Sequence, residues 1–303
     1  MLLGLALVSV AAVSWGTTGS VMTLLGRDGT SSPLLVGWAR MAGAAPCLLL
    51  ATWLARSGSA RAGGERRMHP RSALDGAKTA MLGVAMAAYQ LCYFWAVPRT
   101  GVALTALLAI CSAPIMITAG ATLALKERPT RLTLIALVLA VCGTAMVLAG
   151  PPATAARPQD FTAGAVAAVG AGLSYAVYAV TAKGLLQRAA PLPLAAITFT
   201  LAALLLTPAL AVEPDALTQL TAGWPLLVYL GVVPTAAAYV VFGAGLRRVP
   251  ATAAGIATLL EPLTAAALGV LVFGERLGAV GLIGATLLLS GLVLLVGAGS
   301  GRQ

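Results

Sequence analysis

One pattern occurs twice in this chain, 148 residues apart, and it constrains the fold more than any other feature. A proline is followed 13 residues later by a Glu-Arg pair, and the glutamate is followed 16 residues later by a glycine. The two copies are Pro114, Glu127-Arg128 and Gly143, and Pro262, Glu275-Arg276 and Gly291. A constant offset of this kind indicates an internal duplication, so we expect two similar halves.

The composition requires a lipid environment. Of the 303 residues, 59% are hydrophobic and only 9% are charged, whereas a soluble domain has about 25% charged residues. The net charge of +10 comes from short gaps between apolar runs, so it indicates membrane topology and no nucleic-acid partner. The four cysteines lie inside apolar runs without the paired spacing of a disulfide framework or zinc site, and no phosphate-binding loop is present. We therefore expect no cofactor.

Ten apolar runs are long enough to cross a membrane, which takes roughly 20 residues each. They cover approximately 3–24, 34–55, 77–97, 101–124, 132–149, 162–185, 192–211, 225–245, 251–273 and 279–298. The segment 150–160 contains three prolines and divides the chain nearly in half. The sequence thus predicts an all-α membrane protein with ten transmembrane helices, in which residues 1–150 form one five-helix repeat and residues 151–303 form the second.

The basic residues predict the orientation. Of the 19 Lys and Arg residues, 14 lie on one side of the expected membrane, four lie on the other, and Arg40 lies within a span. The positive-inside rule places the side with 14 basic residues, which also carries both termini, in the cytoplasm. The membrane that we expect is the bacterial inner membrane. Because each half has five spans, the second half enters the membrane upside down. Carriers built from such inverted repeats bind substrate near the midplane and open to each side in turn.

The repeated unit resembles the EamA-type repeat of the drug/metabolite transporter superfamily. The resemblance rests on Ser14-Trp15-Gly16, Arg40, the run Tyr93-Phe94-Trp95-Ala96, and the fourth span from Ala103 to Glu127-Arg128. It implies export of amino acids, other metabolites or drugs, or import of sugars and nucleotide sugars. Aromatic residues in the first and third spans are similar to those of aromatic amino acid exporters. The two repeats differ at Arg40, because its equivalent in the second half is Thr200.

Glu261 is the one acidic residue in the middle of a span, and its repeat equivalent is Ala113. An ionised side chain at that depth costs roughly 2.5–3.5 kcal/mol or more and marks a transport pathway or proton site by default. Three roles remain open: binding a substrate ammonium, carrying a coupled proton, or pairing with Arg40. Arg40 lies near the outer end of the second span. Four roles are open to it: snorkelling to the outer interface, pairing with Glu261, gating the pathway, and holding a substrate carboxylate.

A set of aromatic and amide side chains lies within the spans, and we predict that they line the substrate site. They are Trp15, Tyr89, Gln90, Tyr93, Tyr175, Tyr178 and Tyr239. Tyr89 and Tyr93 share one helix face, as do Tyr175 and Tyr178. The alternative is ordinary hydrogen bonding between helices. Pro114 and Pro262 occupy equivalent positions in the fourth and ninth spans, where each predicts a hinge or a simple bend.

These patterns predict a secondary transporter that exports amino acids or similar small amphipathic metabolites by alternating access. An exporter of cationic drugs and a carrier of sugars or nucleotide sugars are the alternatives, and a channel is more remote. An enzyme is not expected, because the spans lack a second midplane carboxylate and any midplane His or Lys. The expected partners are a small-molecule substrate and membrane lipid, and we expect the monomer to function alone.

Overall fold

The computed structural model describes residues 1–27, 32–61, 73–149, 158–274 and 278–300. Within those ranges the chain is helical and contains no strand, and ten stretches are long and apolar enough to cross a membrane. Each predicted run coincides with one of these stretches. The prediction of an all-α protein with ten membrane-spanning helices is therefore confirmed.

The first half consists of five unbroken helices. They are α1 (Leu2–Arg27), α2 (Pro33–Arg61), α3 (Ala73–Thr100), α4 (Val102–Ala124) and α5 (Arg131–Leu148). A single residue, Gly101, separates α3 from α4, and its φ of 80° is a conformation that glycine adopts without strain. Thr130 begins α5 as an N-cap, since its hydroxyl accepts a hydrogen bond from the backbone nitrogen of Thr133 at 3.1 Å.

The second half has the same five spans, but three of them are interrupted, the seventh (Pro191–Val212) only between residues 206 and 209. Its elements are α6 (Pro158–Leu186), α7 (Pro191–Leu206), the short helices α8 (Ala209–Val212) and α9 (Ala216–Ala222), α10 (Trp224–Gly231), the π-helical segment η1 (Val232–Ala237), α11 (Ala238–Leu246), α12 (Ala251–Ala257), α13 (Leu260–Phe273) and α14 (Ala279–Ser300). The eighth span therefore comprises α10, η1 and α11, and the ninth comprises α12 and α13.

The interruption in the eighth span follows from Pro234, which has no N–H to continue an α-helix. The backbone widens locally into the π-helical segment η1, and the hydroxyl of Thr235 donates to the carbonyl of Leu230, five residues earlier, at 2.7 Å. Its equivalent in the first half, α3, has no proline at that position and continues unbroken. Short π-helical segments of this kind often lie at functional sites.

The ninth span breaks at Thr258 and Leu259. The backbone nitrogens of Leu259 and Glu261 bond to carbonyls three residues earlier, at 3.1 and 3.0 Å, which ends α12 and starts α13. Pro262 consequently lies in the first turn of α13, where a missing N–H leaves no bond unmade. Pro262 thus lies in the middle of the ninth span, beside this break, whereas its equivalent Pro114 lies within the continuous helix α4.

The packing of α5 against α14 shows how the halves are related. A Cβ at Gly143 would lie 2.6 Å from the carbonyl oxygen of Gly284, and one at Gly291 would lie 2.8 Å from that of Ala136. The repeat offset relates the two contacts: Gly143 is the equivalent of Gly291, and Gly284 is the equivalent of Ala136. The two contacts are therefore the same contact with the halves exchanged. Moving from Gly284 to Gly291 along α14 moves the contact back from Gly143 to Ala136 along α5. These equivalent helices are therefore antiparallel, as an inverted repeat requires.

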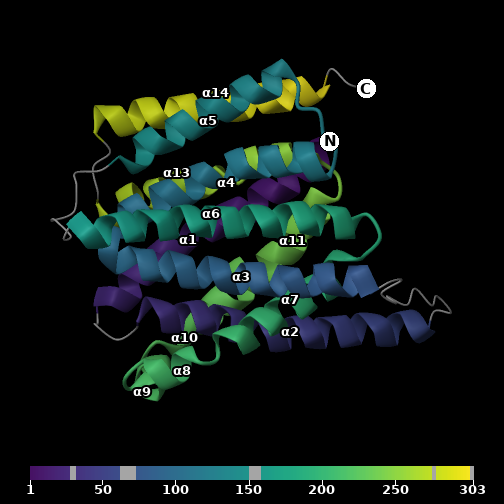
Figure 1. Ribbon diagram of the computed structural model, residues 1–303, viewed down its shortest axis with the longest axis vertical. Coiled ribbons are helices and arrows are strands. Elements are labelled where there is room, and N and C mark those ends of the chain that lie inside the picture. The colour runs from purple at the N-terminus through teal and green to yellow at the C-terminus, as the bar shows by residue number, and fades with distance from the viewer. Residues whose placement is uncertain (28–31, 62–72, 150–157, 275–277, 301–303) are drawn as a thin grey trace.

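The other helices pair across the two halves in the same exchanged manner. Helix α1 packs against α11 and α13, while α6 packs against α3 and α4, and α2 packs against α7. Figure 1 shows the long helices running roughly side by side, with α5 and α14 at one edge and both chain ends at the same end of the bundle. Leu123 and its repeat equivalent Leu271 are 74% and 81% exposed on the outside, as side chains that face lipid are.

Candidate functional site

A cavity of about 50 Å³ lies between the two halves. Ala113 from α4 and its repeat equivalent Glu261 from α13 both line it, so the axis that relates the halves passes close by. Glu261 breaks the symmetry at that point, since one half supplies a carboxylate and the other a methyl group. The polar residues that line the cavity are Trp15, Arg40, Tyr89, Tyr175, Tyr239, Thr258 and Glu261.

Glu261 owes its position to the break in the ninth span. It lies in the first turn of α13, where the positive end of the helix dipole stabilises a carboxylate. Helix α1 approaches closely because residue 16 is glycine: a Cβ there would lie 2.7 Å from the Glu261 carbonyl oxygen. The Glu261 side chain is partly exposed to the cavity. Among the residues that the structure describes, none donates a hydrogen bond to its carboxylate.

Arg40 turns inward to the same cavity. Its Nε donates to the hydroxyl of Thr235 at 3.4 Å, so the π-helical segment η1 holds the guanidinium in place. Within the described part of the chain, Arg40 and Glu261 form no ion pair inside 4.0 Å. Of the roles open to Arg40, the inward orientation does not fit snorkelling to the outer interface.

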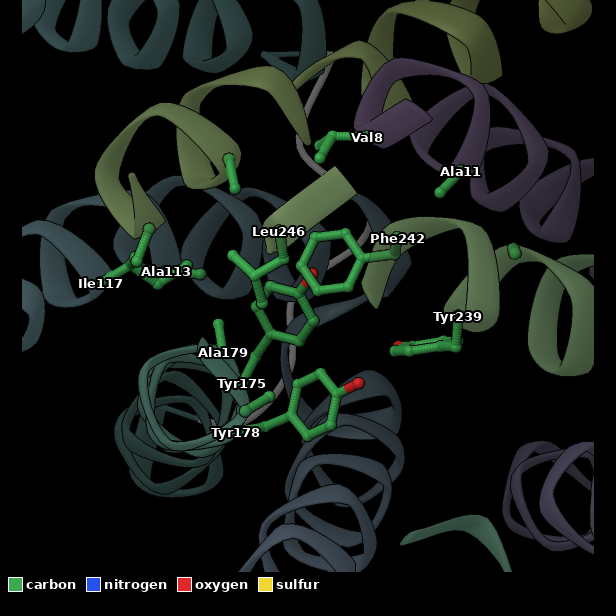
Figure 2. Packing of buried hydrophobic residues seen from close by; sticks show 14 of the residues in the cluster. Val8, Ala11, Ala113, Ile117, Tyr175, Tyr178, Ala179, Tyr239, Phe242 and Leu246 are labelled. Atoms are coloured by element: carbon green, nitrogen blue, oxygen red, sulfur yellow. The ribbon is translucent and has the colours of Figure 1, made fainter. Parts of the chain in front are cut away.

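Aromatic rings form the wall around these two charges. Trp15 from α1 contacts Tyr239 from α11, with ring centroids 4.8 Å apart, and meets Tyr175 from α6 edge-on at 6.3 Å. Tyr89 from α3 joins them at 6.0 Å from Tyr175. Figure 2 shows Tyr175 and Tyr178 reaching from one helix toward Tyr239 and Phe242 of another. Six of the seven predicted side chains thus belong to one aromatic cluster: Trp15, Tyr89, Tyr93, Tyr175, Tyr178 and Tyr239.

Two members of this cluster carry polar atoms that have no partner among the described residues. The indole nitrogen of Trp15 and the hydroxyl oxygen of Tyr175 are buried, and neither makes a hydrogen bond within that part of the chain. Trp15 is only 4% exposed. Buried polar atoms nearly always have partners, so each exception needs an explanation. Both residues line the cavity, so these two unpaired donors lie in its wall.

Five predicted residues do not line the cavity: Gln90, Tyr93, Tyr178, Pro114 and Pro262. Tyr93 and Tyr178 still contact the aromatic cluster, through Tyr89 and Tyr175. Gln90 is 1% exposed, and its Nε2 donates to the carbonyl of Gly37 in α2 at 3.3 Å, which matches the alternative of hydrogen bonding between helices. Pro114 is the neighbour of the lining residue Ala113, and Pro262 is the neighbour of Glu261. Neither proline lines the cavity itself.

Sequence reasoning missed two polar residues of the site, Thr235 and Thr258. Thr235 holds Arg40, and Thr258 lines the cavity at the break between α12 and α13. Their positions depend on how the eighth and ninth spans are interrupted. Pro234 and Pro262 were the available signals, because each lies within four residues of the threonine in question.

Ten apolar helices, paired across two halves around a cavity with a carboxylate and a guanidinium, define a multi-pass membrane protein of the carrier class. The chain belongs to the EamA-like transporter family, whose sequence model matches residues 2–149 and 162–297. The two matched stretches correspond to the two halves of the fold, and the family points to a transporter and not to an enzyme.

Two relatives, one bacterial and one archaeal, are named as uncharacterized transporters. The uncharacterized transporter YwfM of Bacillus subtilis (strain 168) is 34% identical over 295 residues, which are 95% of this chain and 92% of that protein. An uncharacterized transporter of Archaeoglobus fulgidus is 32% identical over 202 residues, which are 67% of this chain and 70% of that protein. A solved crystal structure matches with a TM-score of 0.80 over 99% of both chains at 17% identity, which shows the shared fold alone.

Proposed function

We propose that this transporter is a secondary carrier that exports amino acids or similar small amphipathic metabolites by alternating access. The observation that supports this most is the presence of Glu261 and Arg40 on one aromatic-walled cavity without an ion pair between them. Opposite charges in a low-dielectric interior gain most by finding partners. A zwitterionic substrate supplies both partners at once.

The lining chemistry fits such a substrate group by group. The Glu261 carboxylate accepts from an ammonium, and the Arg40 guanidinium donates two parallel bonds to a carboxylate. The rings of Trp15, Tyr89 and Tyr239 contact an apolar or aromatic side chain and attract a cation through their faces. The free donors of Trp15 and Tyr175 provide further bonds to the substrate carboxylate.

The position of the cavity supports a cycle of opening and closing. It lies between the halves, and residues of both halves line it. Two halves in inverted orientation around the site favour rocking of one half against the other.

The cell location in this proposal is a bacterial inner membrane, with both termini in the cytoplasm. The excess of Lys and Arg on the side that carries the termini supports the orientation. The site is built within one chain, since both halves of the same molecule line the cavity, so a monomer is sufficient for transport. A substrate that enters from the cytoplasm would leave through the opposite face.

Export of cationic drugs is the second candidate, because Glu261 and the aromatic wall also suit a lipophilic cation. Arg40 distinguishes the two, since a guanidinium on the cavity repels a substrate that carries only positive charge. Replacement of Arg40 by alanine is expected to lower exchange of amino acids but to raise exchange of a lipophilic cation. If the substitution instead raises exchange of amino acids and lowers exchange of the lipophilic cation, the drug exporter is favoured.

Counterflow uptake into proteoliposomes, with a panel of radiolabelled amino acids, tests the proposal. We expect exchange of at least one amino acid by the wild type and its loss in Glu261→Gln. The control is Glu213→Gln, the same change at the end of α8 outside the cavity, which should exchange normally. If exchange survives in Glu261→Gln but its dependence on a pH gradient disappears, Glu261 carries a coupled proton. If the wild type moves no amino acid, the substrate assignment is wrong.

A further inference from the structure

Helix α12 differs from every other part of the spans because it has no lipid-facing side. Every residue from 251 to 259 is buried, and the sequence Ala-Thr-Ala-Ala-Gly-Ile-Ala keeps the helix thin enough to be enclosed. Its last turn leads to Thr258 on the central cavity. The repeat-equivalent segment 103–109 at the start of α4 is largely exposed or partly exposed, with only Thr105 and Ala109 buried. The two halves therefore differ clearly in burial at this segment.

Glu127 holds the beginning of α12. Its Oε1 accepts a hydrogen bond from the backbone nitrogen of Ala251 at 2.7 Å, and its Oε2 accepts from the nitrogen and the hydroxyl of Thr252, both at 3.3 Å. Hydrogen bonds to an ionised carboxylate are about twice as strong as neutral ones. Glu127 belongs to the first half and α12 to the second, so these bonds join the two halves.

A second contact fixes the chain just before α12, but within one half. The Nζ of Lys183 in α6 donates to the carbonyls of Leu246 at 2.8 Å and Val249 at 2.7 Å. The turn from 246 to 250 is thereby tied to its own half through Lys183. Among the described residues, the polar connection from the start of α12 to the other half is therefore made by Glu127.

The connection is accessible from the face that carries the N-terminus. A cavity of about 250 Å³ lies there, lined by Met1, Glu127, Arg128 and Thr252 among others. Water in this cavity can replace the bonds to the carboxylate, so they can open without leaving a charge unsolvated. A bond that can open beside a fully enclosed half-helix is suited to a gate.

We propose that Glu127 is the latch of the gate on this face. While its carboxylate holds Ala251 and Thr252, α12 blocks the path from the N-terminal face to the cavity at Thr258 and Glu261. Release of the latch lets α12 move away from the first half and opens that path. The inference rests on the alternating-access part of the proposed function and is independent of the substrate.

Hydrogen–deuterium exchange of the protein in lipid nanodiscs tests the latch without any substrate. Glu127→Gln keeps the side-chain shape but leaves one acceptor oxygen where two are used. We expect exchange in residues 251–258 to become about tenfold faster or more, and exchange in residues 103–109 to become slower. The second change is the informative one, because opening one face of such a carrier closes the other.

Two further variants make the result decisive. Thr252→Val removes one of the three bonds and should give a smaller change in the same two directions, which covers the case in which Glu127→Gln fails to fold. Glu213→Gln should change neither segment. If exchange rises in residues 251–258 and is unchanged in residues 103–109, Glu127 is only a local helix cap and the latch is refuted. If a latch is found but no amino acid is transported, only the substrate assignment fails.

Discussion

Replacing Tyr175 with phenylalanine tests whether its hydroxyl faces the substrate. The hydroxyl oxygen is buried and has no protein partner, and the ring packs against Trp15, Tyr89 and Tyr178. Phenylalanine keeps the ring and its contacts, so no protein bond is lost. An unpaired buried hydroxyl costs about 1–3 kcal/mol, so its removal should leave the melting temperature unchanged or raise it by up to roughly 5 °C.

Substrate binding should respond in the opposite direction. If the hydroxyl donates to a bound amino acid, its loss removes about 0.5–1.5 kcal/mol of binding, which corresponds to roughly a twofold to thirteenfold higher half-saturation concentration. The assay is counterflow of the amino acid that the wild type exchanges best, combined with thermal unfolding of the purified protein. Stability that is kept or gained together with weaker substrate binding is the expected signature.

Tyr178→Phe is the matched control. Tyr178 lies one turn further along α6 and is equally buried, but it does not line the cavity. Its half-saturation concentration should equal that of the wild type. The reasoning is refuted if Tyr175→Phe lowers the melting temperature by several degrees while half-saturation stays unchanged, since the hydroxyl would then have a structural partner.

Three further substitutions test the packing described above. Gly143→Ala would place a methyl group 2.5 Å from a backbone nitrogen of α14, so it should cost about 1–3 kcal/mol and lower the melting temperature, whereas Gly297→Ala on α14 has open space and should not. Gln90→Leu loses a hydrogen bond between helices and should cost about 1 kcal/mol in thermal stability with no change in half-saturation. Lys183→Met leaves two carbonyls before α12 without their donor, so melting should occur at a lower temperature, and an unchanged melting point would contradict the anchoring role.

The sequence predicted the helices and most of the central cluster because both follow from the cost of polar groups in lipid. Ten long apolar runs with very few charged residues have no alternative to spanning helices. Tyr89, Tyr175 and Tyr239 carry hydroxyls that hydrocarbon cannot satisfy, so the shared interior between the halves is where they must meet. The same argument applies to Glu261, because a charged side chain in hydrocarbon costs more free energy than a hydroxyl.

The break in the ninth span was not predictable from local chemistry. Pro114 and Pro262 stand at the same place in the repeat, yet α4 is continuous and the ninth span is broken just before Pro262. The difference depends on contacts made by distant segments, such as the bonds from Glu127 to α12 and the close approach of Gly16 to Glu261. Glu275 and Arg276, the second copy of the Glu-Arg pair, lie outside the described residues.

The position of the central cavity between the two halves has a consequence for the affinity that any experiment will measure. In the alternating-access cycle proposed above, substrate enters only those molecules in which the halves have separated on one side. The apparent dissociation constant is the intrinsic one divided by the fraction of molecules that are open, and an open fraction of about 1% weakens it by about 100-fold. Weak apparent binding would then report the free-energy difference between closed and open molecules, and a substitution far from the site could tighten binding by shifting that balance alone.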